Sequence, residues 1–263
     1  MGASRSLGRF YPVDSPLHAL DPRAKILAVI SLVLGLFFVR SIPGLVLMAV
    51  ALLAVVVMSR VPVKAFLKLP RVVLFIVVFT ALFQALFSRQ GEVLLDWGLL
   101  EVHEGGLLMG IFLAFRVLLL VWMAGLLTAT TGPVALSDGL EDLLSPLRRL
   151  RFPSHEVAMM VTIALRFIPT LQEEAAKIIR AQAARGAGFD EGGPIRRARS
   201  LLPVLLPLVI GAFRRADELA EAMESRGYRG GIGRTRYREL RFGLRDIAAL
   251  TVTMLILALG IAL

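Results

Sequence analysis

The chain has 263 residues, of which 57% are hydrophobic and 19% charged, and its formal net charge is +10 at neutral pH. This composition lies outside the range of soluble globular domains and indicates an integral membrane protein. Cysteine is absent, which excludes disulfide bonds and thiol chemistry. The first apolar run begins only at Ile26, and no small-residue cleavage site follows it. We therefore expect a retained cytosolic lead-in rather than a signal peptide.

Five apolar runs are candidates to cross the membrane, so we expect an all-α integral membrane protein with about five transmembrane helices. In chain order the runs are residues 26–39, 42–58, 72–87, 107–127 and 247–263. Several are shorter than the ~20 residues that a ~30 Å hydrocarbon layer requires. Lysine and arginine side chains at their ends can extend to the headgroups, and this makes the shorter runs acceptable as spans.

The distribution of basic residues orients the chain, because lysine and arginine favour the cytoplasmic side of short membrane loops. A cytoplasmic N-terminus places 27 of the 30 basic residues inside, leaving only Arg40 and Arg89 outside and Arg116 within the fourth run. We expect a multi-pass protein of the cell (inner) membrane with its C-terminus outside. Two further apolar stretches, 157–168 and 201–213, are too short to span and are predicted to be helices buried in the protein or lying near the inner surface.

Three regions follow from this topology. Residues 1–130 form the lead-in and a four-span bundle, residues 131–246 form a cytoplasmic segment, and residues 247–263 form the last span. The cytoplasmic segment contains two long helical stretches with a glycine-rich loop between them, so the two helices can fold back and cross.

The first of the two long helices is predicted from Ser154 to Gly186, with a kink near Pro169, and the second starts at Leu201. Each has small and apolar residues at helical spacing, which allow another helix to approach closely. The predicted stripes are Gln172, Ala175, Ala176, Ile179 and Ala183 on the first helix, and Ala216, Leu219, Ala220 and Met223 on the second.

Each long helix closes with an arginine followed by a glycine, Arg185-Gly186 and Arg226-Gly227. Glycine is the usual residue after a helix end, and arginine is favoured in the last turn, so a single pair has a purely structural explanation. Two pairs in matched settings also fit a binding role. The small residues before them, Ala184 and Ser225, leave each guanidinium able to engage carbonyls or carboxylates of a partner. Both interpretations stay open on the residues alone.

The chain resembles the transmembrane coupling subunit, or T component, of energy-coupling factor transporters of the EcfT/CbiQ family. The resemblance rests on Ala184-Arg185-Gly186, on Ser225-Arg226-Gly227, on the string Ala-Leu-Arg-Phe-Ile-Pro at 164–169 and on the opening segment 14–25. It departs from the family at Ser225, where alanine is usual.

This resemblance implies a function. In the family, two crossed cytoplasmic coupling helices dock on a pair of ABC-type ATPases, and a small membrane protein, the S component, captures a vitamin or metal. By resemblance Arg185 and Arg226 are the coupling contacts, and Arg166 and Pro169 support them structurally. The chain lacks a glycine-rich loop ending in Gly-Lys-Ser/Thr. We therefore expect no cofactor on this chain, with ATP and magnesium held by the partner ATPases.

A membrane enzyme is the first competing class. His18, His103 and His155 fall on different segments, and Met159 occupies the place of the second histidine of a zinc protease helix, so no metal or catalytic site is expected. Asp138, Glu141 and Asp142 form an acidic group that we interpret as one face of an amphipathic helix rather than a metal site.

A permease that acts alone is the second competing class, and Arg116 is the feature that favours it, because a charge inside the membrane is a candidate functional site. The other interpretation is that Arg116 faces the bundle or the S component and hydrogen-bonds carbonyl groups.

A dedicated subunit of a cobalt or nickel importer is a further alternative. Nucleic acid is not an expected partner, because membrane orientation and anionic lipids account for the basic charge.

Overall fold

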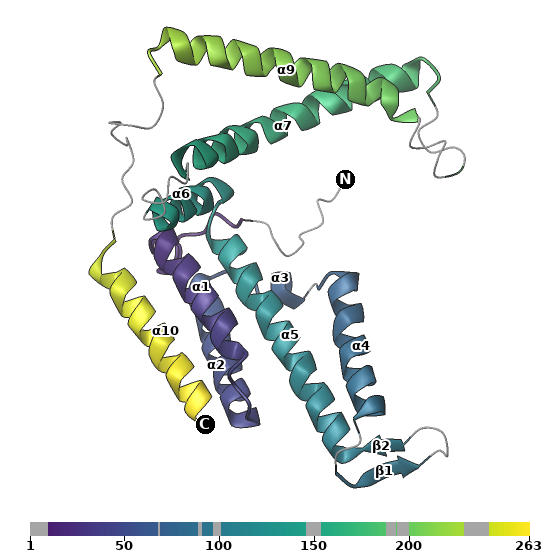
Figure 1. Cartoon of the computed structure of the whole chain (residues 1–263), viewed down its shortest axis with the longest axis vertical. Coiled ribbons are helices and arrows are strands. Elements are labelled where there is room, and N and C mark those ends of the chain that lie inside the picture. Colours follow the sequence, from purple (N-terminus) through teal and green to yellow (C-terminus); the bar gives the residue numbers. More distant parts are fainter. Residues whose placement is uncertain are drawn as a thin grey trace. The chain divides into compact units, whose positions relative to one another are not determined.

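The computed structural model describes residues 10–67, 69–88, 91–96, 101–145, 154–187, 193, 200–228 and 242–263. Helices dominate these residues (Figure 1). The chain divides into two units. The first, called here the membrane unit, comprises Met1–Leu143 and Glu239–Leu263, and the second, the paired-helix unit, comprises Leu144–Arg238.

The membrane unit contains most of the helices. Its elements in chain order are α1 (Pro22–Leu36), α2 (Ile42–Ser59), α3 (Lys64–Leu67), α4 (Arg71–Phe87), β1 (Val93–Asp96), β2 (Glu101–His103), α5 (Glu104–Thr130), α6 (Pro133–Leu144) and α10 (Leu244–Ala262). Polar caps and prolines define where the first two helices begin. The Asp21 side chain accepts a hydrogen bond from the Arg23 N–H at the start of α1, and Ser41 accepts one from Gly44 at the start of α2.

Among the described residues, three helices are long and apolar enough to cross a membrane: α2, α5 and α10. They correspond to the second, fourth and fifth runs expected from sequence. The third run forms α4, an apolar helix of 17 residues. The first run forms α1, whose 15 residues reach about 22 Å, less than a hydrocarbon layer. That α1 crosses the membrane stays a prediction.

Close helix contacts hold the membrane unit together. α5 packs against α4, α2 and α1, and α10 packs against α1 and α2. A Cβ atom at Gly110 of α5 would lie 2.6 Å from the Ala81 carbonyl oxygen of α4, so only glycine allows these two backbones to lie so close. The fully buried side chains of the core include Met48, Leu119 and Met123.

The all-α fold is confirmed, and the structure adds to it one short antiparallel pair of strands, β1 and β2. Val93 pairs with His103, and Asp96 pairs with Glu101. Strands of four and three residues are too short to show a period of two, so their pairing is visible only in the structure.

The paired-helix unit contains α7 (Ser154–Ala184) and α9 (Leu202–Ser225), which cross each other as Figure 1 shows. Both agree with the predicted long helices to within two residues at each end. Pro169 lies inside α7 and Pro207 inside α9. The unit is shorter than the predicted segment 131–246, because α6 and the start of α10 lie with the membrane unit.

The predicted interface stripes are only partly right, because on each helix two of the predicted positions are half-buried and the others are exposed. On α7, Ala175 and Ala176 of the predicted stripe are half-buried, together with Leu171, Glu174 and Ile178, whereas Gln172, Ile179 and Ala183 are exposed. On α9 the half-buried positions include Gly211, Arg215, Leu219 and Met223, whereas Ala216 and Ala220 are exposed. The interface also contains an ion pair that was not predicted, which brings Glu174 and Arg215 into the crossing.

Candidate docking site at two matched helix ends

The end of α7 is closed by the backbone alone. The Ala187 N–H donates to the Gln182 carbonyl oxygen, and the Gly186 N–H donates to the Ala183 carbonyl oxygen, each at 3.0 Å. Gly186 has a φ of +87°. These two bonds and the left-handed glycine define a Schellman motif, with Arg185 as the last residue before the glycine.

The end of α9 has the same construction. The Tyr228 N–H donates to the Met223 carbonyl oxygen at 3.0 Å, and the Gly227 N–H donates to the Glu224 carbonyl oxygen at 2.9 Å. Gly227 has a φ of +72°. Arg226 therefore occupies the position in this motif that Arg185 occupies in the other. The two arginine–glycine pairs are equivalent in backbone structure as well as in sequence.

The glycines of the two motifs are explained by backbone conformation, and the arginines are not. A Cβ atom at Gly186 or Gly227 would meet nothing within 4 Å, so the positive φ is the only constraint on these residues. Arg185 and Arg226 are both exposed. Neither guanidinium makes a hydrogen bond or ion pair with any part of the chain that the structure describes.

Ser225, where the family usually has alanine, fits the second motif without disturbing it. Its hydroxyl donates to the Ala222 carbonyl oxygen at 3.0 Å, within its own helix. The hydroxyl therefore does not compete for the Arg226 side chain. Ala184, at the matching position of α7, is exposed like Ser225.

An ion pair and a glycine lie where α7 and α9 cross. Arg215 of α9 donates to a carboxylate oxygen of Glu174 of α7 at 2.6 Å. A Cβ atom at Gly211, one turn before Arg215, would lie 3.1 Å from the same Glu174 side chain. Glycine at this position therefore lets the two helices approach until the ion pair forms.

Arg166 and Pro169 lie on the first half of α7, and both are exposed. The Arg166 side chain has no hydrogen bond or ion pair within the described residues. Their supporting role stays a prediction.

Arg116 has partners inside the membrane unit. Its guanidinium donates to the Val39 carbonyl oxygen, just beyond the end of α1, and lies 4.7 Å from the centre of the Phe112 ring. A cation at this point supplies a donor to a carbonyl group that follows the short α1. This agrees with the interpretation in which Arg116 faces the bundle and hydrogen-bonds carbonyl groups.

The residues considered for an enzyme lie apart. His18 bonds to Ser15 and to the Tyr11 carbonyl oxygen, and His103 precedes α5. The His155 side chain lies outside the described part of the chain. No group of three potential metal ligands occurs in the part of the chain that the structure describes.

The acidic group lies on α6 and is partly buried. Glu141 is buried, Asp142 pairs with Arg23 at 3.6 Å, and Leu140 is exposed. The helix itself was predicted correctly. Asp142 turns toward the protein because Arg23 of α1 lies there.

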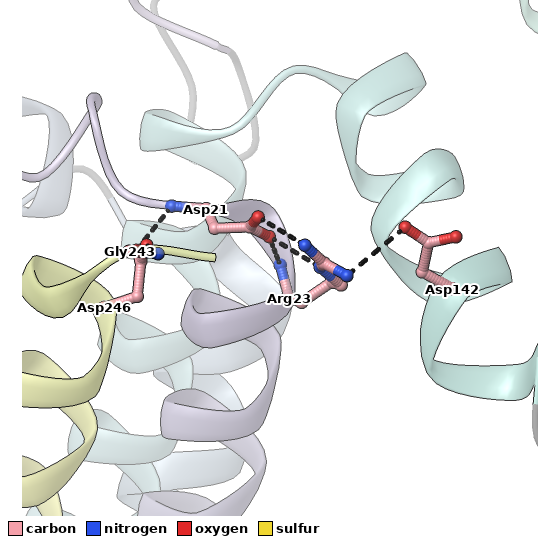
Figure 2. A network of polar contacts seen from close by, with 5 residues as sticks. All are labelled: Asp21, Arg23, Asp142, Gly243 and Asp246. Carbon is pink, nitrogen blue, oxygen red and sulfur yellow. Dashed lines mark hydrogen bonds and ion pairs between the residues drawn. The ribbon is translucent and has the colours of Figure 1, made fainter. Parts of the chain in front are cut away.

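Sequence reasoning used the opening segment for its resemblance and for the topology that its basic residues indicate, and it missed the network that this segment forms. The Asp21 N–H donates to Asp246 of α10 at 2.7 Å, and Arg23 bonds to the Asp21 carboxylate (Figure 2). Burial of Asp21 opposes its ionisation, but its hydrogen bonds to Arg23 outweigh this and hold its pKa below the ordinary value. Burial lowers the pKa of Lys25 to about 8. The alternation of acidic and basic residues at positions 21, 23 and 25 was the available signal.

Comparison with known proteins gives the family. The model of the family described as cobalt transport protein (CbiQ) matches residues 14–237. A protein of Thermanaerovibrio acidaminovorans is 50% identical over 93% of this chain and 91% of its own length. One from Ruminiclostridium cellulolyticum is 47% identical over 95% of this chain and 93% of its own length. One from Bacillus subtilis is 41% identical over 97% of this chain and 96% of its own length.

All three relatives are named energy-coupling factor transporter transmembrane protein EcfT. These matches define the class as a helical membrane subunit of a transporter, which is not an enzyme. The chain belongs to the EcfT/CbiQ family of energy-coupling factor transporter transmembrane proteins.

Proposed function

We propose that this chain is the coupling subunit of an energy-coupling factor ABC importer and that Arg185 and Arg226 dock it on two ATPase subunits. One observation carries the proposal: two crossed helices end in the same backbone motif, each with an exposed arginine that has no partner among the described residues. An arginine in this position can bind carboxylates or carbonyl groups of a partner through its planar fork of donors.

Energy enters through the partners in this proposal. ATP and magnesium bind to the two ATPases, whose association or separation moves the helix ends. The Glu174–Arg215 pair joins α7 to α9 at their crossing, so movement of one helix end acts on both helices.

The exposed apolar face of α9 supports contact of the paired-helix unit with a membrane or a membrane protein. Its first half carries exposed residues at helical spacing: Leu202, Leu205, Leu206, Val209, Ile210 and Phe213. We assign this face to the S component, the small membrane protein that captures the substrate, with lipid covering what remains.

The substrate in this proposal is a vitamin or another micronutrient chosen by the S component. The description of the matching family as cobalt transport protein favours, as a second candidate, a dedicated cobalt or nickel importer. Isolating the native complex and identifying the S component that co-purifies separates the two.

Charge reversal tests the docking. In the double variant Arg185→Glu and Arg226→Glu, the ATPases should no longer co-purify with the chain. The matched control is Arg180→Glu with Arg214→Glu, because these arginines are exposed on the same two helices but lie outside the terminal motifs. Undiminished ATPase recovery with the first pair would defeat the docking claim, and so would equal loss with both pairs.

The proposed orientation places both helix ends in the cytoplasm and the N-terminus on the same side. Because the chain contains no cysteine, single cysteines at positions 185 and 226 can be labelled with an impermeant maleimide in sealed cells. Both should be protected until the membrane is opened. Labelling of either in intact cells would exclude this orientation.

A further inference from the structure

The paired-helix unit is attached to the membrane unit by two stretches of chain. The chain leaves the membrane unit through α6 and returns to it after Arg238, just ahead of α10. Any movement that the chain carries between the two units passes through these outgoing and returning connections. The contacts of both connections lie within the membrane unit.

The outgoing connection is held by the start of α1. Asp142 of α6 lies 3.6 Å from the Arg23 guanidinium. A Cβ atom at Gly139 would lie 3.0 Å from the Pro22 side chain, so α6 packs directly on the first turn of α1. The Lys25 ammonium donates to the Thr130 carbonyl oxygen at the end of α5, immediately before α6. The start of α1 thus binds both the corner before α6 and α6 itself.

The returning connection is held by the same segment. The Asp21 N–H donates to one carboxylate oxygen of Asp246, and the Gly243 N–H donates to the other at 2.8 Å (Figure 2). Phe242 comes directly before Gly243 in the chain, and the centre of its ring lies 5.8 Å from the Arg23 guanidinium carbon. One side chain, Arg23, therefore contacts the outgoing and the returning connection.

Burial makes this arrangement resistant to opening. Asp21, Lys25 and Asp246 are each at most 7% exposed. Separating the segments would remove the Asp21 N–H from the buried Asp246 carboxylate, and losing a partner of a buried charge costs more than losing an ion pair at the surface. Arg23 is held in place by two bonds to the Asp21 carboxylate, at 3.1 and 2.9 Å, so its guanidinium is oriented before it meets Asp142 or Phe242.

We propose that Arg23 is a positioning residue that holds α6 and the start of α10 against the start of α1 through its contacts with Asp142 and Phe242, an arrangement called here the clasp. This inference rests on the proposed function, because the clasp matters for coupling only if the paired-helix unit is moved by ATPases. With the clasp closed, movement of the paired-helix unit acts on α1 and α10 together. With the clasp open, α6 and α10 move apart, and movement of the paired-helix unit is not transmitted to α1.

Distances between α6 and α10 test the clasp in the complete complex with its ATPases. Cysteines at Leu140 and Leu244, both exposed, carry spin labels in the otherwise cysteine-free chain. Distances are measured by pulsed electron resonance without nucleotide and with ATP and vanadate. The unmodified clasp should give one narrow distribution in both states.

Arg23→Gln should shift the balance between closed and open clasp by about tenfold, the effect of losing a charge-assisted hydrogen bond. A second, longer distance should therefore appear and should increase with ATP and vanadate, while ATPase recovery and phosphate release from ATP are retained. The matched control is Arg40→Gln, an exposed arginine of the α1–α2 loop, which should keep the narrow distribution.

Asp142→Asn removes only the contact between Arg23 and α6, and it replaces Arg23→Gln in the experiment if that variant does not assemble. Asp142→Glu keeps the carboxylate and should give the narrow distance distribution again. Narrow, nucleotide-independent distances in both Arg23→Gln and Asp142→Asn would overturn the clasp. Failure of the proposed function has a different signature, because the ATPases would then be missing from every form of the complex, including the unmodified one.

Discussion

Arg215 of α9 donates a hydrogen bond to Glu174 of α7 at 2.6 Å, and each of the two residues lies eleven positions before the arginine that follows its helix. At a rise of ~1.5 Å per residue, Arg185 and Arg226 are both about 17 Å along their helices from the crossing. The two helix segments that run from the ion pair to the terminal arginines therefore have equal length.

Reversing one charge of this pair should loosen the crossing. Both side chains are about one-third exposed, so the pair contributes little through attraction alone. In Glu174→Arg, however, two like charges meet beside Gly211, and the distance distribution between spin labels at 180 and 224 should broaden. The double variant Glu174→Arg with Arg215→Glu should narrow it again. Glu218→Arg on the exposed side of α9 is the control, and equal broadening by this control would contradict the assignment.

Replacing the glycines of the two motifs should weaken docking through backbone strain. Gly186→Ala and Gly227→Ala place a side chain at positive φ, at a cost of about 1 kcal/mol each, although there is space for the methyl group. ATPase recovery should fall, and asparagine, which tolerates the left-handed region, should restore part of it. Gly132→Ala also has open space but no positive φ, and it should have no effect.

Removing the Arg116 side chain should destabilise the membrane unit. Arg116→Met leaves the Val39 carbonyl oxygen without its donor, which costs about 1–3 kcal/mol for a buried group. The midpoint of thermal unfolding in detergent should fall, and Arg116→Lys should recover most of it. If Arg116 instead served a permease that acts alone, the purified chain without ATPases would carry substrate into liposomes, and Arg116→Lys would abolish that transport.

The buried Lys25 should make stability depend on pH. Its pKa in the folded chain is about 8, because burial outweighs the attraction of Asp246 and Asp21, whereas an unfolded chain has a lysine pKa of ~10.4. Between these values the unfolded chain binds more protons, so the free energy of unfolding rises with pH through this window. Thermal unfolding at about pH 7.5 and about pH 9.5 should show this rise, and Lys25→Met should remove it. An equal rise in both proteins would contradict the assignment to Lys25.

The elements that could be predicted from sequence are those with a local signal. α2, α5 and α10 follow from apolar length, α7 and α9 from helical spacing, and the two helix ends from the order of arginine and glycine. Each signal occupies adjacent residues or one helix face. The contact of Arg116 with a carbonyl group could be expected, because an unpaired charge inside a membrane has a high free energy.

The features that sequence reasoning missed depend on residues far apart in the chain. Asp21 and Asp246 are separated by 225 positions, and nothing local to either predicts their bond. The pairing of Glu174 with Arg215 was not predicted, because a charged residue alone favours water and its partner lies on another helix. The burial of Glu141 escaped prediction because it depends on the docking of α6.

The Schellman motifs have a mechanical consequence. Each arginine is joined to its helix by backbone hydrogen bonds within the last turn, so it moves with that helix. The crossing is then the pivot point for two helix segments of equal length. A rotation of about 10° there displaces each guanidinium by about 3 Å, close to the length of one hydrogen bond. Small changes in angle are thereby converted into the making or breaking of whole contacts at the tips.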